Sequence, residues 1–296
     1  MWLHLDQKKP ALNEEKSGSA QNDNGQINAD ADIKEKTQTV HIKRKNGKDI
    51  TMELEEYLIG VVGSEMPASF ANEALKAQAV AARTFVAKRN FEVDDTTSSQ
   101  VFQDESQLKQ VWGEHYNENQ NRVKNAVMET KGEVLTYQGE LITAAFFSSC
   151  NGYTNNSEDY WSSKSPYLRS VESKWDKEVE GNVQQTTFTL SDFSAALGFQ
   201  QAVTSISSPK RYPNGYVESI LIDGISFSGR EVREALSLRS SDFEITTDQQ
   251  SVIIKTTGFG HGIGMSQYGA KAMAEAGADY QKILKYYYSG TEITKL

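Results

Sequence analysis

The sequence predicts an α+β fold in which helices and β-hairpins surround a substrate cleft, and it leaves open a division into two lobes with a boundary near residues 175–215. Three observations support this class. Hairpin-type turn dipeptides separate short alternating apolar runs. Longer stretches are rich in good helix formers such as alanine, glutamate and lysine. The two kinds of segment follow each other without a regular strand–helix–strand rhythm, which argues against a parallel sheet.

The first 38 residues should form a flexible tether. They are mostly Gln, Asn, Asp, Lys, Ser and Ala, with too few large apolar side chains to offset the entropy lost on ordering. No stretch of the chain approaches the ~20 apolar residues of a membrane span. We expect the tether to be what remains after removal of a membrane anchor, and residues 39–296 to form the folded catalytic region.

Within the folded region each element has a local signal. A hairpin is expected first, because Asn46-Gly47 separates two alternating runs. Apolar residues at helical spacing then predict a helix that ends at Gly63. The alanine-rich segment Ala71–Arg89 predicts a second helix. The remaining expected elements are a helix over Glu118–Thr130, a hairpin over Glu133–Ser149 turning at Gln138-Gly139, a hairpin over Tyr216–Phe227 turning at Asp223-Gly224, a short helix over Arg230–Leu236, a strand over Ser251–Thr256, and helices over Ser266–Ala276 and Asp279–Tyr288.

Composition excludes several classes of function. The formal net charge of -9 and the pI near 5.1 leave no basic field to attract nucleic acid. Cys150 is the single cysteine, so the chain has no internal disulfide and no cysteine cluster for zinc or iron–sulfur. The four histidines show no ligand spacing. We therefore expect neither a metal nor any other cofactor.

The most informative run extends from Thr257 to Tyr268 and contains four glycines in alternate positions. Glycine permits unusual backbone dihedrals and close approach of another surface. The spacing does not fit G-x-G-x-x-G, and no Gly-Lys-Ser/Thr follows, so neither a dinucleotide turn nor a phosphate loop is predicted. A tight structural connection remains open. The alternative is a polar-substrate site, because neutral hydrogen-bonding side chains gather there: His261, Ser266, Gln267 and Tyr268.

Glu65 is the leading candidate for an acid catalyst. It follows a predicted helix C-terminus and precedes Met66 and Pro67, and both the helix dipole and apolar neighbours disfavour its ionised form. Arg83 lies among core-type residues of the alanine-rich helix, where it needs a carboxylate or a substrate partner; a structural salt bridge is the open alternative. Gln78 lies on the same helix, about 140° away around its axis.

Ser148, Ser149 and Cys150 invite nucleophile interpretations, but no Gly-x-Ser-x-Gly elbow surrounds the serines. Cys150 could pair with His261 in a cysteine-dependent hydrolase. A small buried thiol at a strand end is the simpler interpretation.

Three blocks together resemble the stage II sporulation protein D family, which is related to the amidase-enhancer domain. The first runs from Gly63-Ser-Glu-Met-Pro through Glu73 to Thr84, the second is Phe146-Phe-Ser-Ser-Cys-Asn-Gly-Tyr-Thr, and the third is Gly260-His-Gly-Ile-Gly-Met-Ser-Gln-Tyr-Gly-Ala. The resemblance implies a lytic transglycosylase of peptidoglycan. It also implies an N-terminal membrane anchor and a location facing the space between mother cell and forespore during engulfment, where sporulation proteins P and M are partners and P first strips stem peptides from the glycan strands.

Carried onto this chain, the resemblance makes Glu65 the catalytic glutamate and Arg83 an arginine of the active-site cleft. A lytic transglycosylase needs only one carboxyl group, which acts first as acid and then as base, whereas water-using glycosidases normally need two. We expect neutral hydrogen-bonders and a cation around Glu65. The expected substrate-binding residues are Gln78, Gln100, Ser149, His261, Ser266, Gln267 and Tyr268.

Two departures from the family pattern matter. Some relatives carry zinc in a loop after the catalytic helix, but the corresponding segment Asp94–Val101 has neither thiol nor imidazole. Phe147 and Tyr153 stand where other members often have histidines. The alternative to an enzyme is a wall-binding scaffold that stimulates a partner amidase without cutting glycan.

Overall fold

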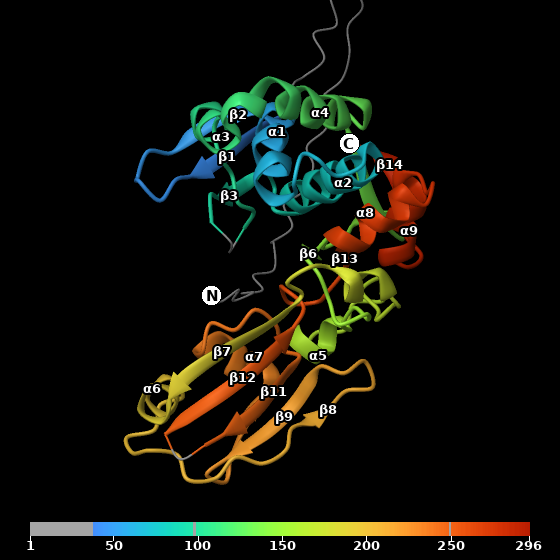
Figure 1. Cartoon of the computed structure of the whole chain (residues 1–296). Coiled ribbons are helices and arrows are strands. Elements are labelled where there is room, and N and C mark those ends of the chain that lie inside the picture. The colour runs from blue at the N-terminus through green and yellow to red at the C-terminus, as the bar shows by residue number, and fades with distance from the viewer. Residues whose placement is uncertain (1–37, 97–98, 249) are drawn as a thin grey trace, which may run out of the picture.

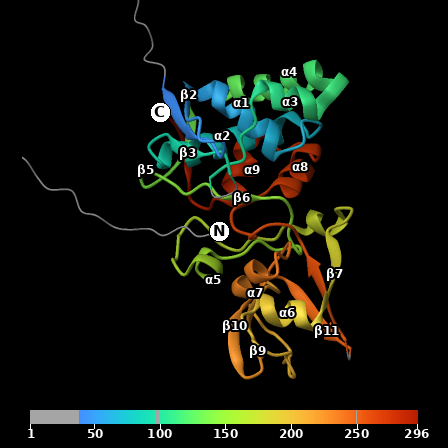
Figure 2. The same ribbon diagram turned by 90° about the vertical axis from the view of Figure 1, so that its left-hand side faces the viewer.

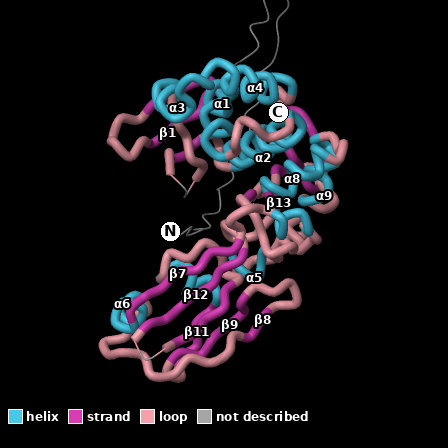
Figure 3. Tube along the Cα trace, in the orientation of Figure 1, coloured by secondary structure: helices cyan, strands magenta, loops and turns pink. Residues whose placement is uncertain are grey.

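The computed structural model describes residues 38–96, 99–248 and 250–296. The described chain forms a helical lobe and a β-rich lobe (Figures 1 and 3). They meet at a junction that contains β6 (Phe146–Phe147), β13 (Met265–Ser266) and α5 (Ser157–Trp161). Each lobe has its own hydrophobic core. The combination of helices with several small sheets confirms the α+β class. The expected tether lies outside the described residues, apart from Gln38.

Three helices form the centre of the helical lobe: α1 (Leu54–Glu65), α2 (Asn72–Lys88) and α4 (Tyr116–Glu129). Side chains on every face of α2 are buried, from Ala74 to Ala87. Its many alanines let the neighbouring helices approach closely, because interaxial distance depends on side-chain size. The three predicted helices are confirmed, whereas α3 (Glu105–Trp112) was not expected.

Two small sheets complete the helical lobe. The predicted first hairpin is confirmed: β1 (Thr39–Lys43) pairs antiparallel with β2 (Ile50–Glu53), and β3 (Glu92–Asp94) joins β1 in parallel. In the second sheet β4 (Glu133–Tyr137) lies between β5 (Glu140–Leu141) and the C-terminal β14 (Glu292–Lys295).

The hairpin expected over Glu133–Ser149 is only partly correct. It turns at Gln138-Gly139 but ends at Leu141. The chain then crosses to the junction, where β6 (Phe146–Phe147) pairs in parallel with β13 (Met265–Ser266). Pairing with the glycine-rich run therefore replaces the second half of the expected hairpin.

The β-rich lobe contains two three-stranded sheets flanked by short helices (Figure 2). The predicted hairpin at Asp223-Gly224 and the strand ending near Thr256 are both confirmed. The elements of this lobe are β7 (Val183–Thr189), α6 (Leu190–Ala196), β8 (Lys210–Arg211), β9 (Val217–Ile222), β10 (Ile225–Ser228), α7 (Gly229–Ala235), β11 (Phe243–Thr247) and β12 (Ser251–Thr257).

The remaining helices lie at the junction or beside α2. Helix α5 (Ser157–Trp161) and the 3₁₀ helix Lys174–Glu178 follow β6. The two predicted C-terminal helices are confirmed as α8 (Gln267–Glu275) and α9 (Tyr280–Tyr287). None of the helices in the described part of the chain is long and apolar enough to cross a membrane.

Gly63 does not end the first helix, as the sequence had suggested. Helix α1 continues to Glu65, and Gly63 serves close packing instead. A Cβ atom at Gly63 would lie 2.8 Å from Cη2 of Trp112, so any side chain there would displace the indole. The last turn of α1 therefore includes Glu65.

Candidate active site

Glu65 is the last residue of α1, and its two carboxyl oxygens have different surroundings. Oε1 accepts a hydrogen bond from the Val101 backbone N–H at 2.7 Å, whereas no other group of the described residues bonds Oε2. Burial raises the pKa of Glu65, and the Val101 N–H opposes this rise because it favours the ionised form. No charged side chain in the described part of the chain contributes to the shift. Oε2 is thus the carboxyl oxygen of Glu65 without a described partner, and burial disfavours the ionised form of the group.

Tyr57 and Gln100 lie beside this carboxyl group. Tyr57 is eight residues before Glu65 on α1, and its hydroxyl donates to Gln100 Oε1 at 3.1 Å. Burial, followed by the charge of Glu65, raises the pKa of Tyr57. Gln100 is buried, and its Nε2 also donates to Ala82 O at 3.4 Å. Gln100 therefore braces the segment that leads to Val101.

Gln267 and Gln78 meet at the backbone of Glu65. Gln267 Nε2 donates to Glu65 O at 2.9 Å and to Gln78 Oε1 at 3.4 Å. Both side chains are buried, and Gln78 Nε2 has no partner among the described residues. The first residue of α8 is thus fixed to the last residue of α1, although they are 202 positions apart.

Arg83 does not lie at Glu65, which corrects the expectation of a cleft arginine. Its buried guanidinium binds both carboxylate oxygens of Glu55, at 3.1 and 2.5 Å, and the carbonyl oxygens of Val127 and Glu133, each at 3.1 Å. Glu55 is ten residues before Glu65 on α1, roughly 15 Å along the helix axis. The open alternative, a structural salt bridge, describes Arg83.

The glycines of the run Thr257–Tyr268 bring it against the protein itself. Gly260 has a φ of 120°, and a Cβ atom there would lie 2.6 Å from Cβ of Phe147. Phe259 exchanges two backbone hydrogen bonds with Ser149, at 3.1 and 2.7 Å. Tight packing against β6 and the residues after it is therefore what the repeated glycine provides.

Ser266 and Ser149 belong to a buried polar network beneath this run. Ser266 Oγ donates to Asp176 Oδ2 at 2.7 Å and accepts from the Gly269 N–H as the N-cap of α8. Ser149 Oγ donates to Asn182 Oδ1 at 2.6 Å. Both serines are buried with these partners, so they shape the loop and do not face a substrate.

His261 lies in an aromatic cluster with Trp161, Phe147 and Tyr160, at ring-centroid distances of 5.3, 5.9 and 6.1 Å. Its Nδ1 accepts the Ile263 N–H at 3.0 Å. Burial lowers the pKa of His261 to about 3, and the positive charges of Arg233 and Arg230 add to this effect. His261 is therefore a neutral acceptor at physiological pH.

A thiol–imidazole pair is not formed. Cys150 Sγ donates to Asp176 Oδ2 at 2.8 Å, and burial and the charge of Asp176 raise the pKa of the thiol. Both effects oppose the thiolate that a nucleophile requires. The hypothesis of a Cys150–His261 hydrolase is contradicted by this geometry.

Tyr268 remains at the edge of the site. Its N–H donates to Ser148 O at 3.1 Å, and its partly exposed ring contacts Phe70 edge-on, with centroids 5.1 Å apart. Among residues 38–96, 99–248 and 250–296, no three His, Cys, Asp or Glu side chains converge as metal ligands would. Two positions of the segment Asp94–Val101, residues 97–98, lie outside the described residues.

Comparison with known proteins identifies the family. The model of the stage II sporulation protein family matches residues 44–137. Stage II sporulation protein D of Bacillus amyloliquefaciens is 44% identical over 90% of this chain and 82% of its own length. The protein of the same name from Bacillus subtilis is 45% identical over 82% of this chain and 74% of its own length.

The chain belongs to the stage II sporulation protein D family. An amidase enhancer of Bacillus subtilis is also similar, at 35% identity over 80% of this chain and 40% of its own length. The part that matches the family model contains Glu65, Gln78, Arg83 and Gln100, and it stops before the glycine-rich run. Membership confirms the resemblance found in the three sequence blocks and makes this a sporulation protein.

The structure thus separates the predicted site residues that lie near Glu65 from those that do not. Gln78, Gln100 and Gln267 gather around Glu65, while Arg83 does not. Two surface hollows lie elsewhere, one near Ser208 and one near Asn214, and Glu65 lines neither. Sequence reasoning missed Tyr57 and Val101. Tyr57 is eight residues from Glu65, about 80° around the helix axis, so helical spacing does not indicate it, and a backbone donor leaves no signal in the sequence.

Proposed function

We propose that this protein is a peptidoglycan lytic transglycosylase that cuts between N-acetylmuramic acid and N-acetylglucosamine in peptide-stripped strands during engulfment. The observation that carries the proposal is the asymmetry of Glu65: Oε1 is held by the Val101 N–H, Oε2 is free of described partners, and burial raises the pKa. A raised pKa favours the protonated form that a general acid needs.

The reaction needs one such group. Oε2–H of Glu65 protonates the glycosidic oxygen, and the bond from that oxygen to C1 of the muramic acid breaks. The 6-hydroxyl oxygen of the same sugar then bonds to C1, and its proton returns to Glu65. The products are a free 4-hydroxyl and a 1,6-anhydro end, no water is consumed, and the acid is regenerated.

The surroundings of Glu65 support this mechanism over hydrolysis. Inverting and retaining glycosidases place a second carboxylate roughly 5–9.5 Å from the first. At Glu65 no carboxyl group of the described residues bonds to the side chain, whose one described hydrogen-bond partner is the Val101 N–H. Gln267 Nε2 donates to the Glu65 carbonyl oxygen at 2.9 Å, which fixes the backbone position from which the Glu65 side chain extends.

The test compares Glu65→Gln with Glu56→Gln, a matched control on the exposed side of the same helix. Peptide-stripped glycan strands are digested and their ends are analysed by mass spectrometry. We expect anhydro ends from the native protein and from Glu56→Gln, and none from Glu65→Gln with an unchanged circular dichroism spectrum. Anhydro ends from folded Glu65→Gln would remove Glu65 from this role, and reducing ends instead would indicate a hydrolase.

The second candidate is a scaffold that stimulates an amidase without cutting glycan. It is favoured by the similarity to a protein named amidase enhancer. Stimulation of a purified amidase by the Glu65→Gln variant, measured beside anhydro-end release, separates the two. A scaffold should stimulate the amidase equally as the native protein and as the variant, and it should release no product in either form.

We further propose a membrane-tethered location facing the space between mother cell and forespore, with sporulation proteins P and M as partners. Membership of the family supports this setting. Prior removal of stem peptides by P would supply the stripped strands. Cross-linking in sporulating cells should then recover P and M with this protein, and their absence from the cross-linked material would count against the partnership.

A further inference from the structure

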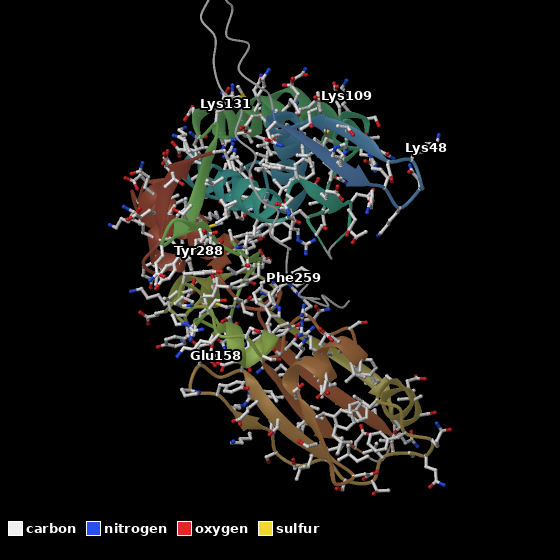
Figure 4. All side chains as sticks on the ribbon, turned by 180° about the vertical axis from the view of Figure 1, so that it is seen from behind. Lys48, Lys109, Lys131, Glu158, Phe259 and Tyr288 are labelled. Atoms are coloured by element: carbon white, nitrogen blue, oxygen red, sulfur yellow. The ribbon has the colours of Figure 1, made fainter. Side chains whose placement is uncertain are left out.

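Phe259 presents an exposed aromatic ring from a fixed backbone. It lies near the start of the glycine-rich run, where its N–H and carbonyl both bond to Ser149. Even so, 47% of the residue is exposed. Figure 4 shows Phe259 on the inner side of the bend where the two lobes meet. A large ring held this way is ready to contact a ligand that enters between the lobes.

The guanidinium of Arg239 lies over the Phe259 ring, and its positive charge has no carboxylate partner among the described residues. Its Cζ is 4.4 Å from the ring centroid of Phe259. One terminal nitrogen donates to Gly181 O at 2.9 Å and to Gln184 Oε1 at 3.2 Å, and both acceptors are neutral. Nε is shielded from solvent and lacks a partner among the described residues, and no described carboxylate forms an ion pair with Arg239. Five other arginines each pair with a carboxylate: Arg44, Arg83, Arg169, Arg211 and Arg230. Arg122 and Arg233 resemble Arg239 in bonding to neutral oxygens, but only Arg239 lies over the exposed ring of Phe259.

We propose that Phe259 and Arg239 form a subsite for an N-acetylmuramic acid residue whose lactyl carboxylate is free. The inference rests on the proposed function and specifies which strands the site accepts. The C–H face of the sugar would contact the exposed part of the phenyl ring, and the carboxylate would pair with the guanidinium. While a stem peptide is attached, the same lactyl group is a neutral amide. The subsite therefore distinguishes stripped strands from substituted ones by charge.

Short contacts connect this subsite to Glu65. Phe259 is bonded to Ser149, and the preceding Ser148 O accepts the Tyr268 N–H at 3.1 Å. Gln267, next to Tyr268, donates to the backbone of Glu65. In this proposal a glycan strand that crosses the junction contacts both the acid and the subsite, and the stripped sugar binds away from the bond that is cut.

The experiment measures binding, so that its outcome does not depend on cleavage. The full chain carries Glu65→Gln to keep strands intact, and its affinity is measured by fluorescence anisotropy. Two labelled probes are compared: peptide-stripped glycan strands, and the same strands after the lactyl carboxylates are converted to methylamides. We expect the acid form to bind roughly tenfold more tightly, as for loss of one charge-assisted hydrogen bond.

Arg239→Gln should abolish this preference, and Arg239→Lys should retain part of it. Phe259→Ala should weaken the binding of both probes equally. Lys255→Gln is the control: it removes one positive charge from the same lobe and should leave the preference for the acid form intact. The subsite would be overturned if the Glu65→Gln chain bound the two probes equally. It would also be overturned if folded Arg239→Gln still preferred the probe with free carboxylates. Because anhydro-end release by Glu65→Gln is scored separately, failure of the lyase mechanism and failure of the subsite give different results.

Discussion

Replacing Arg83 should lower the free energy of unfolding and leave the chemical step of glycan cleavage largely unchanged. The guanidinium connects the start of α1 through Glu55 to the end of α4 through Val127 and to β4 through Glu133. Arg83 is fully buried, and the Glu55 side chain is only 17% exposed. Removing one partner of such a pair leaves a buried charge without compensation and costs about 3–5 kcal/mol. This is a large fraction of the roughly 5–15 kcal/mol that stabilises a typical domain.

Arg83→Lys is the informative variant because it keeps the charge but loses the two-pronged contact with Glu55. We expect it to lose about 2 kcal/mol, from one hydrogen bond to Glu55 and one to a buried carbonyl. Urea unfolding followed by circular dichroism measures this loss, with anhydro-end release assayed on the same samples. Glu55→Gln should cost a similar amount, and the double variant should cost less than the sum.

The reasoning fails if folded Arg83→Lys has the native urea midpoint but has lost glycan cleavage by orders of magnitude. That outcome would place the guanidinium on the substrate. In the expected outcome, activity measured well below the unfolding transition is retained. Glu55→Gln is the matched control, because it breaks the same pair without touching Arg83.

Two further predictions concern His261 and Cys150. Because folding lowers the pKa of His261 from 6.5 to about 3, the neutral ring stabilises the fold fully above pH ~6.5, and this contribution, less than roughly 5 kcal/mol, is lost as pH falls toward 3. Urea unfolding should show a smaller loss between pH 7 and pH 4 in His261→Gln, and a ring that titrates near 6.5 by NMR would contradict the burial argument. The Cys150 thiol should react with a disulfide reagent only after unfolding, since burial raises its pKa; rapid modification of the native protein with loss of cleavage would restore the cysteine hypothesis.

The fold was largely predictable where periodic segments carried local signals. Helix α2 and the hairpin turn at Asp223-Gly224 were found because helix formers and turn residues act over a few positions. Gly63 misled the prediction, since glycine is used both to end helices and to admit a neighbour such as Trp112. The two uses look identical until the packing partner is known. Helix boundaries fixed by tertiary contacts therefore cannot be found from the local sequence.

The site was less predictable because its contacts are long-range. Glu65 could be singled out by its position at a helix end, and Gln267 by its place in an unusual run, but nothing in the sequence indicated that one bonds to the backbone of the other. Arg83 was assigned to the cleft by the family resemblance, whereas its residues alone left a structural salt bridge open. The core-type residues around Arg83 indicated that it was buried, yet they could not show that its partner was Glu55.

The bond between Gln267 and Glu65 gives the glycine-rich run a function beyond shape. The run starts at the end of β12, passes Phe259 in the opening between the lobes, and ends where α8 meets α1. Gly258, Gly260 and Gly264 let the backbone lie against residues 145–150, whereas Gly262 lies against Tyr216. Phe259 and Gln267 are therefore held on one continuous path. A loop with ordinary side chains could not approach β6 this closely. If the proposed acid and sugar subsite are correct, the same close packing sets the distance between them, which a longer flexible loop could not do.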